Sequence, residues 1–171
     1  PHGEIKVAFT PDEEIGRGAD MFDYKKFNAD YAYTLDGGPV GSIEFENFNA
    51  ASADVHVSGI SIHPGDSKDK MVNAILIAME FNSLLDATAR PEHTESYEGF
   101  YHLHDMSGDV SNTEMNYIIR DHDSQAFAFK KYQIVKARDF INNKYQVELV
   151  KVDVKDSYYN MASFFTDQMH I

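Results

Sequence analysis

Two adjacent glutamates, Glu13 and Glu14, are the residues of this sequence whose types and spacing most suggest chemistry. They follow the apolar segment 5–9, which has the composition of a buried strand, and they stand in a turn between Pro11 and Gly16. Successive side chains of an extended chain point in opposite directions, so only a sharp turn lets both carboxylates serve one cavity. One can then bind a metal ion while the other transfers protons. The alternative is the acidic first turn of an ordinary helix, where carboxylates favour the helix dipole.

Three further candidates lie at predicted strand ends or in turns. Asp36 follows the strand-like segment 31–35, and ligands of open α/β sheets bind beyond the carboxyl ends of strands, so it can face the same crevice as the glutamates. His63 lies in a turn, where it can act as a hydrogen-bond donor or an acid, and Arg120 can pair with a substrate carboxylate. A plain Asp-Gly-Gly turn, a surface histidine and a solvated arginine are the alternatives.

Composition excludes several other functions. The formal net charge of -13, with scattered lysines and arginines, argues against binding to nucleic acid or to an anionic membrane. The sequence contains no cysteine, so a metal ion would be bound by histidine and carboxylate, and a cytoplasmic location is expected. His102 and His104 are two residues apart on a predicted strand, but no carboxylate at a convincing spacing completes a metal site.

Residues 1–47 have the pattern of an α/β domain. Strand-like segments alternate with short helical ones, which is typical of a parallel sheet, and this part is predicted to be a partial parallel-sheet domain. The predicted strands are 5–9, 31–35 and 42–46. A buried strand of this type needs flanking strands and helices, which this segment does not supply.

Residues 48–156 have the pattern of an α+β domain. Segments with strand and helix periodicity follow one another in the order β-α-β-β-α-β, which is the ferredoxin-like arrangement of two helices on an antiparallel four-stranded sheet. A bulge is expected between Leu149 and Val150, where the apolar phase of the last strand shifts. The predicted elements are 53–58, 69–87, 97–106, 112–121, 124–142 and 145–154. Residues 157–171 are helix-prone and apolar, and no other predicted element remains to cover them.

Taken together, these motifs closely resemble the peptidase T family of cytoplasmic, zinc-dependent bacterial tripeptide aminopeptidases. The order and spacing of the motifs agree from residue 5 to residue 161 and are specific to this family within the wider clan of di-zinc peptidases and acylases. The matching segments are 7–16, which includes the acidic turn, and 33–38, 45–51, 63–65, 97–103, 117–121 and 156–161.

The resemblance implies a role for each candidate. Glu13 corresponds to the general base, whereas Glu14 and Asp36 correspond to ligands of two different zinc ions. His63 would stabilise the developing oxyanion, often in a partner subunit's site, and Arg120 would hold the C-terminal carboxylate of a tripeptide substrate. Residues 1–47 would be part of the catalytic domain, and residues 157–171 would return to it. Residues 48–156 would be a lid inserted in that domain, and this lid would also mediate homo-oligomer formation.

The sequence also departs from the family pattern. The family's His-x-Asp motif, its bridging aspartate and its final histidine ligand have no counterpart here, so we expect an inactive fragment that binds zinc weakly. Two other hypotheses stay open. The chain can be a non-catalytic, ferredoxin-like dimerisation module, or part of a related di-zinc dipeptidase or acylase.

Overall fold

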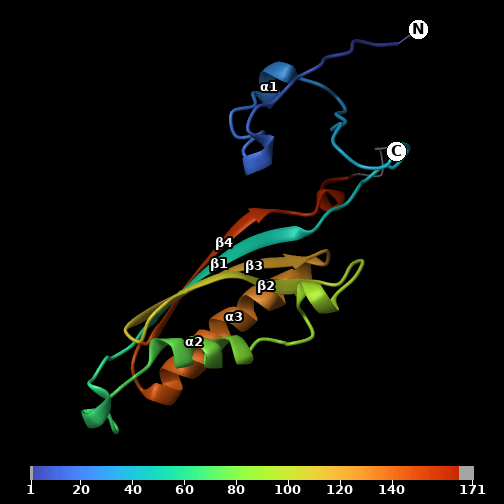
Figure 1. Cartoon of the computed structure of the whole chain (residues 1–171). Helices are drawn as coiled ribbons and strands as arrows, with labels where there is room; N and C mark the ends of the chain where they lie inside the picture. The colour runs from blue at the N-terminus through green and yellow to red at the C-terminus, as the bar shows by residue number, and fades with distance from the viewer. Residues whose placement is uncertain (1, 166–171) are drawn as a thin grey trace. The chain divides into compact units, whose positions relative to one another are not determined.

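The computed structural model describes residues 2–165, and the contacts within it divide the chain into two units, Pro1–Ser42 and Ile43–Ile171. The first unit contains a short 3-10 helix at Glu13–Ile15 and the four-residue helix α1, Tyr24–Phe27. The second unit contains the sheet and the two longer helices (Figure 1). Its elements are β1 (Asn49–Ser58), α2 (Ala74–Ser83), β2 (Phe100–Gly108), β3 (Asn112–Asp121), α3 (Ser124–Tyr145) and β4 (Val150–Tyr158), with short 3-10 helices at Pro64–Asp66, Pro91–His93 and Met161–Phe164.

The second unit has the predicted ferredoxin-like fold. Its four strands form one antiparallel sheet in the order β2-β3-β1-β4. Both α2 and α3 lie on the same face of this sheet (Figure 1). The two strands at the edges, β2 and β4, are the ones that follow the two helices in the chain. This arrangement confirms the α+β architecture expected for residues 48–156.

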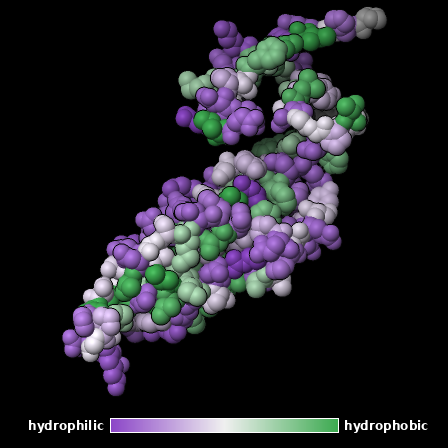
Figure 2. Space-filling model, in the orientation of Figure 1, coloured by the Kyte–Doolittle hydropathy of each residue, from purple (hydrophilic) through white to green (hydrophobic). Residues whose placement is uncertain are grey.

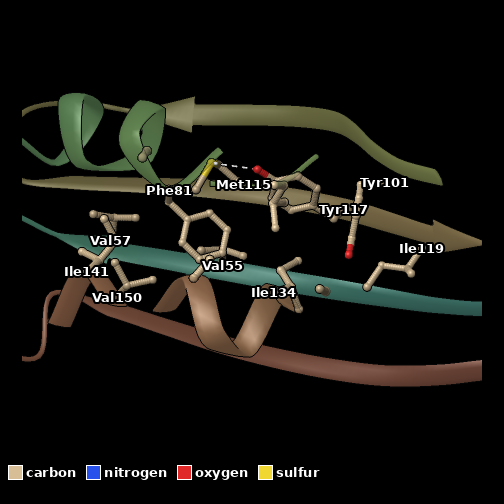
Figure 3. Close-up of a cluster of buried hydrophobic side chains, with 14 of the residues drawn as sticks. Val55, Val57, Phe81, Tyr101, Met115, Tyr117, Ile119, Ile134, Ile141 and Val150 are labelled. Carbon is tan, nitrogen blue, oxygen red and sulfur yellow. Dashed lines mark hydrogen bonds between the residues drawn. The ribbon is translucent and has the colours of Figure 1, made fainter. Parts of the chain in front are cut away.

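The core lies between the sheet and the two helices, as the alternation along the strands requires. Val55 and Val57 of β1 point toward the helices, and Phe81 of α2 packs on them with its side chain fully buried (Figure 3). The ring of Tyr117 lies 6.3 Å from that of Phe81, and its hydroxyl donates to Asn82 Oδ1 at 3.0 Å. The core therefore accommodates a tyrosine without leaving its hydroxyl unpaired.

Several element boundaries differ from the prediction, and the structure gives a reason for those of α2 and α3. Helix α2 begins at Ala74 rather than near 69, because the side chain of Asn73 caps it and Val72 pairs with Ile60 in extended conformation. Helix α3 runs on to Tyr145 and ends at Gln146, which has a left-handed φ of 56°. β4 therefore starts later than the predicted residue 145.

The bulge predicted between Leu149 and Val150 is wrong in position. Leu149 and Val150 are both buried, but Leu149 lies in the connection before β4. The alternation of buried residues within the strand is therefore not interrupted there. The register instead shifts between Ala50 and Ala51 in the pairing of β1 with β4, and between Leu103 and Asp105 in the pairing of β2 with β3.

The three strands predicted before residue 47 are not formed within the described residues. The side chains of Phe9 and Leu35, which those strands were expected to bury, are 93% and 98% exposed. Hydrophobic side chains are accordingly visible on the surface of the first unit (Figure 2). A parallel strand is stable only when neighbouring strands and covering helices surround it, and unit 1 supplies neither.

The tail differs in part from the helix predicted for residues 157–171. β4 continues to Tyr158, and a 3-10 helix follows at Met161–Phe164. Residues 166–171 lie outside the described residues. No helix in the described part of the chain is both long enough and apolar enough to cross a lipid bilayer.

Candidate functional site

Glu13 and Glu14 lie in a tight turn of the first unit. They open the three-residue 3-10 helix Glu13–Ile15, which is flanked by Asp12 and Gly16, both in left-handed conformation with φ of 62° and 71°. The Gly16 amide donates to the Glu13 carbonyl at 2.7 Å and closes the turn. Both glutamate side chains are exposed. Of the two interpretations of this motif, the structure has the sharp turn rather than the start of a long helix.

Asp36 also lies in the first unit, in an exposed turn where its Oδ1 accepts from the Gly37 amide at 2.7 Å. Zinc in proteins takes about four ligands, and carboxylate oxygens are suitable ones. Among residues 2–165, however, no group of three or more histidine or acidic side chains is arranged to hold a metal ion. Glu14 and Asp36 therefore have the right chemistry for zinc, but they do not form a zinc site by themselves.

His63 caps the short 3-10 helix Pro64–Asp66 of the second unit, and its ring is exposed. Its Nδ1 accepts from the Gly65 amide at 3.2 Å. The neutral ring consequently carries its proton on Nε2, which can donate to an oxyanion.

Arg120 lies near the end of β3 and is half-buried. Its Nη1 donates to the backbone carbonyls of Ile119 at 3.0 Å and Ala51 at 3.4 Å. Its guanidinium carbon lies 5.4 Å from the centre of the Tyr158 ring. The side chain is thus held against the sheet, as a binding residue on a rigid support would be.

His63 and Arg120 lie at opposite ends of β1. Arg120 pairs with Ala50 at the start of this strand, whereas His63 comes after its last residue, Ser58. At roughly 3.3 Å per residue, the strand extends about 26 Å from Ala50 to Ser58. Within one chain, the length of β1 therefore separates the Arg120 end of the sheet from the end at which the His63 turn begins.

His102 and His104 lie on β2 with ring centres 6.1 Å apart, and both side chains are exposed. The described residues provide no third ligand near them, as the absence of a three-residue cluster shows.

Three asparagines that sequence reasoning did not select join the start of β1 to the segment that follows β4, at the end of the sheet where Arg120 lies. Asn49 is buried, and its Oδ1 accepts from the Asn160 amide while its Nδ2 donates to the carbonyls of Asp121 and His122, all at 3.0 Å. Asn160 in turn accepts from the Asn47 amide at 3.1 Å, and Asn47 accepts from the Met161 amide at 2.7 Å. We call Asn47, Asn49 and Asn160 the asparagine clamp. It fixes the place where the chain enters and leaves the sheet.

His122 sits directly against this clamp. Its ring lies 4.0 Å from that of Phe48 and 4.7 Å from that of Tyr97, and its Nδ1 is buried without a hydrogen-bond partner among the described residues. The hydroxyl of Tyr97 donates to Glu46 at 2.6 Å, and this carboxylate raises the pKa of the tyrosine. The segment before β1 is therefore tied to the loop before β2 as well as to the tail.

The similarity to known proteins can now be set beside this geometry. The family model of the peptidase dimerisation domain matches residues 45–146. The chain belongs to this family. The match begins just before the asparagine clamp and includes β1, β2, β3 and the two longer helices, so the dimerisation domain is the ferredoxin-like unit described above.

Peptidases T from several bacteria are similar to the chain beyond its dimerisation domain. The peptidase T of Caldanaerobacter subterraneus is 54% identical over 170 residues, which are 99% of this chain and 42% of that protein. The peptidase T of Clostridium acetobutylicum is 56% identical over 94% of this chain and 39% of that protein. The chain thus spans about two fifths of the length of these relatives, and the resemblance to the peptidase T family is confirmed.

Solved structures confirm the fold. The crystal structure of aminopeptidase PepT from Bacillus cereus superposes with a TM-score of 0.76 at 21% identity, over 94% of this chain and 43% of that one. A Staphylococcus aureus tripeptidase superposes with a TM-score of 0.75 at 19% identity, over 88% of this chain and 41% of that one.

Truncation of Asn49 tests the clamp. Asn49→Ala leaves the Asn160 amide without its acceptor and removes the Asn49 donor from the carbonyls of Asp121 and His122, so the free energy of unfolding should fall by about 1–3 kcal/mol. Urea titration followed by circular dichroism measures this loss. Asn143→Ala, at an exposed position of α3, is the matched control and should change stability by less than about 0.5 kcal/mol. Equal stabilities of the two variants would contradict the clamp.

Proposed function

We propose that this chain is a segment of a zinc-dependent tripeptide aminopeptidase of the peptidase T type. The observation that carries this proposal is the extent of the similarity. The dimerisation-domain match starts at residue 45, whereas the Caldanaerobacter peptidase T aligns with 99% of the chain. The similarity therefore includes the first unit, which contains Glu13, Glu14 and Asp36. A chain that served only as a dimerisation module would not need to resemble a peptidase in this unit.

Glu14 and Asp36 are the residues of this chain that would hold zinc, one for each of two ions. Zinc, when bound, supplies Lewis-acid activation of a water molecule. Because the described residues contain no complete ligand set, we propose that the other ligands come from outside this sequence. The isolated chain is accordingly inactive and binds zinc weakly.

The remaining candidates act through hydrogen bonds and charge. Glu13 is exposed and next to a metal ligand, so it is placed to take a proton from the attacking water. Arg120 holds the C-terminal carboxylate of the tripeptide through its fork of N–H groups. His63 donates from Nε2 to the oxyanion that forms at the peptide carbonyl.

A homo-oligomer accounts for the separation of His63 from Arg120. The two lie at opposite ends of β1, so we propose that His63 acts in the site of a second copy, brought there by the dimerisation domain. Leu76 and Met79 on α2 are 60% and 59% exposed, so this helix surface is available for the contact between copies. Strand β2 lies at an edge of the sheet and is a second surface available for it. We also propose a cytoplasmic location.

Substrate selectivity of the full-length protein tests the proposed function. We expect hydrolysis of unmodified tripeptides at their first peptide bond, with much slower cleavage of dipeptides and N-acylated amino acids, measured by chromatography of the products. Preference for dipeptides or acylated amino acids would indicate the related enzymes instead. A protein that dimerises and cleaves none of these compounds would be a non-catalytic dimerisation module.

A further inference from the structure

Three side chains form a row on the face of the sheet that the helices do not cover. Ala50 of β1 pairs with Arg120 of β3 on one side and with Tyr158 of β4 on the other. Residues directly opposite each other in antiparallel strands project to the same face. The next residue, Ala51, belongs to the core beneath the helices, so the row that contains Ala50 lies on the opposite, open face.

A β-bulge brings Tyr158 into this row. Ala51 pairs with Asp156 whereas Ala50 pairs with Tyr158, so Ser157 is an extra residue in β4. In a regular ladder Ser157 would stand opposite Ala50, and Tyr158 would project toward the helix-covered face. The bulge therefore turns the tyrosine onto the face where Arg120 lies.

Arg120 and Tyr158 contact each other above Ala50, the small residue that lies between them in the sheet. Ala50 is fully buried, and the guanidinium carbon of Arg120 lies 5.4 Å from the centre of the Tyr158 ring. A cation within about 6 Å of an aromatic ring is attracted to its face. A larger side chain at position 50 would keep the two groups apart.

The position of Tyr158 is fixed on both sides along the chain. Before it, the Asp156 carboxylate accepts from Lys131 Nζ at 2.6 Å and from the Tyr159 hydroxyl at 2.7 Å, and the lysine holds the pKa of this carboxyl below its usual range. After it, Asn160 is held by the asparagine clamp. The bulge is thus a fixed part of the fold.

We propose that Tyr158 is a positioning residue that orients Arg120 for recognition of a carboxylate, an inference that rests on the proposed function. Within the described part of the chain, both hydrogen bonds of the guanidinium use Nη1. The ring of Tyr158 lies on one side of the guanidinium, and the two carbonyls hold Nη1. The remaining nitrogens, Nε and Nη2, are therefore left for the two oxygens of the substrate's C-terminal carboxylate. Tyr158 thereby contributes to the preference for peptides with a free C-terminus.

Steady-state kinetics of the full-length enzyme test this role. A tripeptide is compared with its C-terminal amide, which has no carboxylate, in the wild-type enzyme and in Tyr158→Leu, Tyr158→Phe and Arg120→Gln. Tyr158→Leu should raise KM for the free acid by about 2- to 30-fold, with kcat nearly unchanged and KM for the amide unaffected. Tyr158→Phe keeps the aromatic face and should behave as wild type.

The Arg120 variant separates failure of this inference from failure of the proposed function. If Arg120→Gln abolishes the preference for the free acid while Tyr158→Leu retains it, Tyr158 is not a positioning residue and the proposed role of Arg120 stands. If Arg120→Gln retains the preference, the role assigned to Arg120 is itself wrong.

A measurement on the unsubstituted protein avoids dependence on how the variants fold. The ring current of Tyr158 should shift the side-chain proton resonances of Arg120 upfield from those of Arg138 in an NMR spectrum. Unshifted Arg120 resonances would overturn the proposal, because the guanidinium would then not lie over the ring.

Discussion

Glu13→Gln in the full-length protein is expected to lower kcat for tripeptides by about 10²- to 10⁴-fold, the range that general acid–base catalysis contributes, if Glu13 has the proposed role of general base. Glutamine matches glutamate in size but cannot take a proton from the attacking water. Glu13 is exposed in its turn, so the substitution should have little effect on folding. Initial-rate kinetics, with zinc content measured by mass spectrometry, check the result.

A control distinguishes a general base from a metal ligand or a bystander. Glu4→Gln removes another exposed carboxylate of the same unit and should leave kcat unchanged. If Glu13→Gln loses zinc, Glu13 is a zinc ligand rather than the general base. If the variant has wild-type activity, Glu13 has no role in catalysis.

Phe81→Ala should lower the free energy of unfolding of the dimerisation domain by about 3–5 kcal/mol. The Phe81 ring is fully buried and packs against Tyr117, so truncation leaves a cavity between α2 and the sheet. The free energy is obtained from urea unfolding of the chain, followed by circular dichroism. A loss of this size is a large part of the stability of a typical domain.

Phe140→Ala is the matched control for this core substitution. It removes the same side chain from α3, but Phe140 is 52% exposed, so the loss should be below about 1 kcal/mol. Similar losses in the two variants would mean that Phe81 is not in the core described here.

The order of elements in the dimerisation domain could be predicted because its strands and helices have clear periodicity. Strand β3, at Asn112–Asp121, has the predicted bounds, since its alternating residues are buried on one face only. The start of α2 was predicted too early because apolar residues at helical spacing begin at Met71, before Asn73. The helix begins at Ala74 because Asn73 caps it and because Val72 is paired with Ile60. Such tertiary pairings have no signal in local periodicity.

The candidate site was predictable only where local residue types determine the conformation. The turn at Glu13 and Glu14 follows from the proline and glycine that flank it, whereas strand 5–9 depends on neighbours that the first unit lacks. The partners of Asn49 in the clamp lie more than 70 residues away in sequence. Asn47 and Asn49 lie at the predicted boundary between residues 1–47 and 48–156, and local residue patterns contain no signal for partners so distant in sequence.

Zinc titration of the metal-free, full-length protein tests the central claim most directly. That claim is that this chain supplies one ligand to each of two zinc ions. Isothermal titration calorimetry should give two tightly bound ions in the wild type, and one in Glu14→Gln and in Asp36→Asn. Two tight ions in both variants, or in the isolated chain of 171 residues, would contradict it.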